Sequence, residues 1–69
     1  MIVNGYSIEA NADLTNADLR GADLTDADLV GAVLEGANLT DANIAGADLT
    51  GFDLQQTKFN NAQVQGVNL

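Results

Sequence analysis

The 69-residue chain contains no cysteine and no histidine, and it has only two basic residues against ten acidic ones. Without cysteine, neither a disulfide nor a thiolate metal site can add stability to a domain whose size makes it marginal. Without histidine, the commonest general base and the commonest metal ligand are missing. The net charge of −8 argues against direct binding to a phosphate backbone, which depends on clustered lysine and arginine. The composition predicts one small acidic domain, spanning 1–69, with no cofactor and no direct nucleic-acid binding.

Long apolar stretches are also absent from the sequence. No run approaches the roughly 18 residues that are needed to cross a bilayer. The first residues, Met-Ile-Val-Asn-Gly-Tyr, have neither the basic segment nor the apolar segment of a signal peptide. We therefore expect no membrane contact, and a location in the cytoplasm or within an assembled particle.

A period of five residues dominates the sequence from Ala12 onward. Alanine lies two places before the large apolar residue in nine of the twelve units, and aspartate or asparagine lies between them in nine of twelve. The large apolar residues of these units are Leu14, Leu19, Leu24, Leu29, Leu34, Leu39, Ile44, Leu49, Leu54, Phe59, Val64 and Leu69.

This spacing fits neither a regular helix nor a flat strand. Five residues rotate an α-helix by about 140° beyond a full turn, so the leucine row would spiral around it. On a strand, an odd spacing would point successive leucines to opposite faces. Glycine, asparagine or aspartate ends ten of the eleven complete units, with Gln56 as the exception, and turns favour these residues. The pattern predicts short extended segments joined by corners, with leucine and alanine inward.

The units resemble the A(D/N)LXX repeat of the pentapeptide-repeat family, and the resemblance covers 12–69. It implies an all-β fold, a right-handed quadrilateral β-helix with four pentads per coil and about three to three and a half coils. With four pentads per coil, residues twenty apart should stack in columns. One such column is Asp28, Asp48 and Asn68, in which two carboxylates lie in direct register and repel each other.

Residues 1–11 leave two alternatives open. They form either two degenerate pentads, 1–5 and 6–10, with Val3 and Ile8 inward and Asn11 as a bulge, or a cap across the first coil. The degenerate pentads are slightly favoured. In both cases these residues shield one edge of the solenoid, as solubility requires.

The outward positions supply the first set of candidate partner-binding residues. Acidic residues crowd the beginning of the repeats, and the valines Val30 and Val33 interrupt the polar surface near one corner. An acidic surface favours a basic partner, although a polar outer face with bonds to nearby backbone groups is the favoured explanation of the aspartates. The candidate aspartates are Asp13, Asp18, Asp23 and Asp28.

The last coil supplies the second set of candidates. The inward residues Leu54, Phe59, Val64 and Leu69 would be exposed at an uncovered end, together with unpaired backbone groups. A bare solenoid end favours association. We therefore expect this end to bind a copy of the chain or another protein.

Catalytic chemistry is missing from the sequence. Serine and threonine hydroxyls have no histidine or cysteine to activate them, and exposed aspartates have no apolar pocket that would raise a pKa. We expect no enzyme activity and no small-molecule substrate. The leading hypothesis is a structural or adaptor subunit of a larger assembly, of which a virion or capsid accessory protein is one form. The alternative, which the resemblance implies, is an acidic DNA mimic that binds DNA gyrase or another DNA-binding protein.

Overall fold

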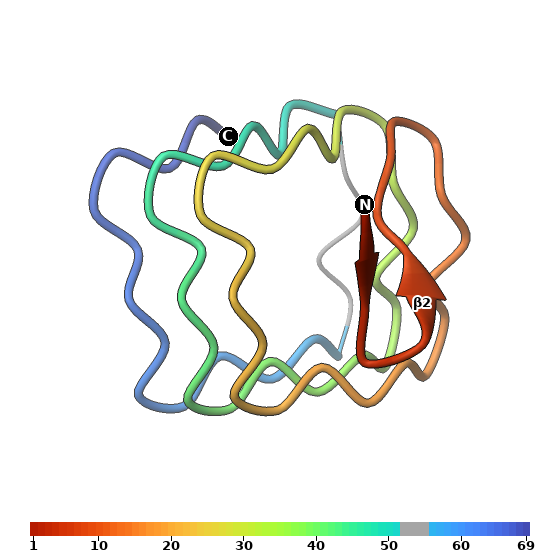
Figure 1. Cartoon of the computed structure of the whole chain (residues 1–69), viewed down its shortest axis with the longest axis horizontal. Coiled ribbons are helices and arrows are strands. Elements are labelled where there is room, and N and C mark those ends of the chain that lie inside the picture. The colour runs from red at the N-terminus through yellow and green to blue at the C-terminus, as the bar shows by residue number, and fades with distance from the viewer. Residues whose placement is uncertain (52–55) are drawn as a thin grey trace.

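The computed structural model describes residues 1–51 and 56–69, and its regular part is a stack of square coils (Figure 1). We name these coils the first (residues 12–31), the second (32–51) and the third (52–69). The end of the stack at the first coil is called the upper end, and the opposite end the lower end. The predicted inward Leu54 and the outward Asp53 lie outside the described residues.

Each corner whose residues are all described is a turn closed by one backbone hydrogen bond. In the first unit the N–H of Ala17 donates to the carbonyl of Leu14 (3.0 Å), and Asn16 between them has φ 59°. A positive φ at this position is the feature of a type II turn, which glycine and asparagine tolerate best. Gln56, the exception in the sequence, adopts φ 59° as well. The stacked coil therefore imposes the corner geometry even where the residue does not favour it.

The coils are joined by parallel pairing between residues twenty apart. Each described unit of the second coil donates a backbone hydrogen bond to the first coil and accepts one from it. For example, the N–H of Val33 donates to the carbonyl of Ala12 (2.9 Å), and the N–H of Leu14 donates to the carbonyl of Val33 (2.8 Å). The predicted columns are confirmed where both partners are described. The pairs are Asp13 with Val33, Asp18 with Asn38, Asp23 with Asn43, Asp28 with Asp48, Asn38 with Lys58, Asn43 with Gln63, and Asp48 with Asn68.

The core is a column of leucines lined by alanines. The leucine row of the first two coils is at most 2 % exposed, and every residue buried among the described ones is apolar. Burial of one such leucine contributes about 1.5–3 kcal/mol. Alanine beside leucine keeps the four walls close together, because a larger residue in its place would overpack the centre. The alternation of small and large inward residues thus fixes the width of the coil.

Corner residues also contact each other from coil to coil. The side-chain oxygen of Asn16 lies against Gly36, at the point where a Cβ would stand, and Asp26 lies in the same way over Gly46. Glycine at these corners therefore provides both a positive φ and the space for the side chain of the coil above.

The first residues form a β-hairpin, so the slightly favoured interpretation as two degenerate pentads is wrong. Strand β1 (Ile2–Val3) pairs antiparallel with β2 (Tyr6–Ser7), in the register Ile2 to Ser7 and Val3 to Tyr6. Asn4 (φ 53°) and Gly5 (φ 86°) form the turn, and two consecutive positive φ values reverse the chain instead of turning it by one corner. The hairpin lies against the end of the stack opposite the blue third coil (Figure 1).

The predicted inward positions of Val3 and Ile8 are nevertheless found in this segment. Ile8 is buried, and Val3 packs against the core from the hairpin. The first regular corner follows, with the N–H of Ala12 bonded to Glu9 (3.1 Å) and Asn11 at φ 63°. Asn11 is therefore a regular corner residue and not the predicted bulge, and the one-residue offset lies before it, where the hairpin joins the coil.

Candidate interaction surfaces

The outward aspartates and asparagines bond to the backbone of their own unit. The carboxylate of Asp13 accepts from the N–H of Thr15 (3.1 Å) and from its hydroxyl (2.6 Å), and Asn38 accepts the same two bonds from Thr40 (3.1 and 2.6 Å). The threonine hydroxyl and then its N–H hold the pKa of Asp13 below its usual value, and those of Asp23 and Asp48 likewise. These side chains therefore fix the corner as well as forming a polar surface.

Asp18 has a basic partner. Its two oxygens accept from Nε (2.8 Å) and Nη2 (2.9 Å) of Arg20, and both side chains are more than half exposed. The hydrogen bond from Arg20 lowers the pKa of Asp18, and the same bond raises that of Arg20. Exposed ion pairs contribute little stability. The pair neutralises one of the four candidate aspartates.

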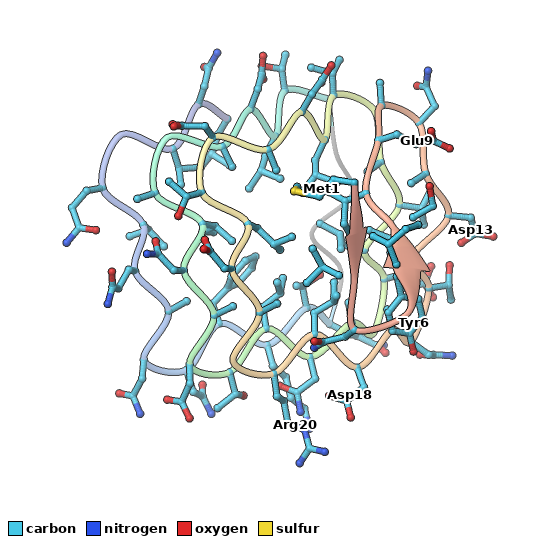
Figure 2. All side chains as sticks on the ribbon, in the orientation of Figure 1. Met1, Tyr6, Glu9, Asp13, Asp18 and Arg20 are labelled. Atoms are coloured by element: carbon cyan, nitrogen blue, oxygen red, sulfur yellow. The ribbon has the colours of Figure 1, made fainter. Side chains whose placement is uncertain are left out.

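The hairpin replaces a missing coil beside this pair. In lower coils, an N–H at this position donates to the carbonyl above it, as Asn38 does to Ala17. The N–H of Asp18 donates instead to the hydroxyl of Tyr6 (3.1 Å), and the Nδ2 of Asn4 donates to the carbonyl of Asp18 (3.4 Å). Figure 2 shows Tyr6, Asp18 and Arg20 at the same edge. An open polar hollow of about 680 Å³ lies here, lined by Asn4, Tyr6, Asp18, Arg20, Gly21 and Asp41.

The four candidate aspartates surround the first coil and do not form one patch. Asp13, Asp18, Asp23 and Asp28 each begin a different column, so they lie on four different sides. Val30 (37 % exposed) and Val33 (36 % exposed) flank the corner at Gly31, as the sequence predicts. The acidic surface is a girdle, and the two valines are a small apolar break below it.

The lower end carries an open apolar hollow of about 310 Å³. Val64 is 52 % exposed and Leu69 is 72 % exposed, whereas Phe59 is half-buried. The structure therefore brings together three of the four predicted lower-end residues, and Leu54 lies outside the described residues. The hollow is lined by Ile44, Leu49, Phe59, Val64, Val67 and Leu69.

Metal ligation and membrane spanning find no support among the described residues. Across 1–51 and 56–69, no group of three or more acidic, histidine or cysteine side chains is arranged to hold a metal ion. In that part of the chain, no helix has the length and apolar character to cross a bilayer.

Two signals in the sequence were missed. Asn4-Gly5 between apolar residues is a strong hairpin signal, and it would have favoured the hairpin over the degenerate pentads. The pairing of Asp18 with Arg20, two residues apart on one extended segment, could also have been predicted, because such residues lie on the same side of a strand.

Comparison with known proteins gives two similarities. The family description "Pentapeptide repeats (8 copies)" matches residues 10–41 and 37–69. Among solved structures, a pentapeptide repeat protein (Rfr23) from the cyanobacterium Cyanothece 51142 is 44% identical, with a TM-score of 0.79. The match covers 81% of this chain and 39% of that one, so this chain spans well under half of that protein's length. No curated protein matches significantly.

These similarities confirm the all-β quadrilateral β-helix that the sequence predicts. Proteins of this kind are structural and interaction modules, commonly bind other proteins and are generally not enzymes. With the family description matched over nearly the whole sequence and a related structure superposed on most of it, the chain belongs to the pentapeptide repeat family.

Proposed function

We propose that this chain is a non-enzymatic accessory, cement or adaptor subunit that takes its place in a larger protein assembly, such as a virion or capsid, through its lower end. The observation that carries the proposal is the apolar hollow, with Val64 and Leu69 exposed at its rim. Large exposed apolar surface is unusual on a small soluble domain and marks interaction sites. The acidic girdle and the pair Val30 and Val33 are candidate contacts along the side of the stack.

The chemistry around the hollow favours a protein partner. From residue 56 onward the only charged side chain is Lys58, and the other polar groups are amides and one hydroxyl. An apolar centre with an uncharged polar rim resembles the anatomy of a protein interface. The lower edge also presents the strand backbone of the third coil, to which a partner's extended segment can add.

The test is whether the chain depends on the hollow to enter its assembly. In extracts of its source, the wild-type chain should sediment with a large particle, and Val64→Glu should sediment at the mass of the free chain. Gln65→Glu is the matched control, because it adds the same charge at an exposed neighbour that does not line the hollow. Equal sedimentation of wild type and Val64→Glu would contradict the proposal.

The second candidate is an acidic DNA mimic that binds DNA gyrase or another DNA-binding protein. The net charge of −8 and the acidic girdle favour it. The described block measures 23 × 22 × 20 Å, so it presents no elongated rod over which a duplex-like charge pattern could extend. A gyrase supercoiling assay distinguishes the candidates. Inhibition that is lost when Asp13, Asp23 and Asp28 are changed to asparagine would support mimicry, and no effect at high excess would remove it.

A further inference from the structure

The upper end of the stack carries two exposed apolar side chains on the hairpin, Met1 and Ile2. In the hairpin, Val3 and Tyr6 pack against the core, so Ile2 on the opposite face points outward and is 68 % exposed. Met1 is 61 % exposed, and Figure 2 shows its side chain extending over the opening of the first coil. The upper end therefore presents a projection, whereas the lower end presents a hollow.

The two ends also differ in charge. The first coil contains five aspartates and one arginine, whereas residues 56–69 contain one lysine and no acidic residue. An upper end facing another upper end would bring two acidic girdles together, which costs free energy. An upper end facing a lower end brings an acidic surface to one with almost no net charge, because the third coil contains one aspartate and one lysine.

We propose that copies of this chain stack head to tail, with Met1 and Ile2 of one copy inserted into the lower hollow of the next. The proposal rests on the proposed function, since it names a second copy as the occupant of the hollow. Contact between two lower ends would place two hollows against each other and fill neither. A head-to-tail contact fills the hollow with apolar side chains and leaves a free projection and a free hollow at the two ends.

Such a contact does not close on itself. Because each copy uses different surfaces for its two neighbours, the contact is heterologous, and its repetition along the axis gives a linear array. The mass of the species in solution should therefore rise continuously with protein concentration. A symmetric contact would stop at two copies.

The test uses two variants that each destroy one surface. Ile2→Glu removes the projection and keeps the hollow, and Val64→Glu removes the hollow and keeps the projection. Light scattering on a sizing column should show each variant alone as a monomer. An equimolar mixture should show a species of twice that mass and nothing larger, because only one productive contact remains. Gln65→Glu, which adds the same charge at an exposed residue that does not line the hollow, should associate like the wild type.

The alternative outcomes are distinguishable. Circular dichroism of each variant verifies that the coil is folded. Assembly of the two variants in the mixture is independent evidence that both are folded. If the wild type stays monomeric at every concentration, the stacking proposal is wrong. The proposed function is then still tested separately, by the sedimentation of Val64→Glu in extracts. A wild-type mass fixed at two copies, unchanged by Ile2→Glu, overturns it in favour of a lower-end dimer. Two variants that remain monomeric when mixed also overturn it.

Discussion

The second and third coils follow the same five-residue pattern but differ sharply in burial. Inward residues of the second coil such as Leu39 (1 % exposed) and Leu49 (2 %) are inaccessible, whereas Val64 (52 %) and Leu69 (72 %) in the third coil are open. The second coil has a coil on each side of it, and the third has one on one side only. A leucine in this fold is therefore buried by the neighbouring coil and not by its own.

This difference predicts an uneven distribution of stability. In a solenoid, each repeat contacts only its neighbours, so stability is close to a sum of repeat and interface terms. The third coil has one interface, and it should open before the second one does.

Shortening an inward side chain should cost most in the second coil. Leu39→Ala removes a fully buried leucine and should lower the free energy of unfolding by about 2–5 kcal/mol. Val64→Ala, at a half-exposed position, should lower it by about 1 kcal/mol or less. Urea unfolding followed by circular dichroism measures both. Both values apply to the dilute, unassociated chain, and equal losses there would contradict the difference in burial between the two coils.

A corner that lies below the side chain of an asparagine or aspartate should tolerate an added side chain less well than a corner with nothing above it. At Gly21 (φ 67°), an added Cβ meets no atom within 4 Å, so Gly21→Ala should cost only the left-handed backbone strain of about 1–2 kcal/mol. At Gly36 the Cβ would collide with Asn16, so Gly36→Ala should cost at least about 1 kcal/mol more. Thermal unfolding gives both values.

The added cost at Gly36 has its own control. Asn16→Gly removes the colliding side chain and is compatible with the positive φ at that position. The double variant should therefore lose no more, relative to Asn16→Gly, than Gly21→Ala loses relative to the wild type. If Gly36→Ala lowers the free energy of unfolding as much in the Asn16→Gly background as in the wild type, the strain lies in the corner itself and not in the contact with Asn16.

The first coil should be more sensitive to acid than the second, because it uses aspartate where the second uses asparagine at two columns. The pKa values of Asp13, Asp18 and Asp23 are lowered from 3.8 in the folded chain, chiefly by bonds from Thr15, Arg20 and Thr25. A lowered pKa gives stability that is present above the unfolded value and lost as the pH falls through the folded value. The free energy of unfolding should therefore decrease below pH 3.8 through these groups.

Relief of the net negative charge acts in the opposite direction, so a matched variant is needed. In Asp13→Asn with Asp23→Asn, the threonine bonds can persist, since Asn38 accepts the same bonds from Thr40 at the same distances. The double variant should show a shallower fall in stability between about pH 5 and about pH 2. An unchanged fall would assign the acid sensitivity to other carboxylates.

The smallest effect is expected at the like-charge pair between coils. Asp28 pairs in register with Asp48, and the N–H of Val30 bonds to the Asp28 side chain (3.2 Å). Asp28→Asn can keep that bond and removes the repulsion, so it should stabilise the chain by a few tenths of a kcal/mol. The gain should disappear at high salt, because exposed charges are then screened.

The coil and its columns could be predicted because one period specifies them. Leu14 to Leu49 and the turn residues between them repeat a local rule, and each unit satisfies that rule independently. Four pentads per coil came from the family resemblance, since a five-residue period alone does not state how many corners close a coil. The pairing of Asp13 with Val33, and of its counterparts on the other sides, then follows.

The ends were less predictable because no repeat specifies them. The hairpin depends on Asn4 and Gly5, and its position depends on Tyr6 reaching the N–H of Asp18, a contact between residues twelve apart that no periodicity encodes. Thr57 occupies a position where most units have alanine. The sequence shows this exception, but it does not show which group the hydroxyl contacts. Its hydroxyl donates to the carbonyl of Leu34 (2.6 Å), so the structure satisfies the polar group at the edge of the core.

The separation of twenty between paired residues has a consequence for how such a surface can change. Insertion or deletion of twenty residues adds or removes one complete coil and leaves every column aligned. Insertion of five rotates all later residues by a quarter turn about the axis, while leucine still faces inward and the corners still close. A short duplication can thus carry one side chain, such as Val33, from one wall of the block to the next without disturbing the interior. In this architecture the placement of surface residues is separable from folding, and insertions or deletions of five residues can change that placement during evolution.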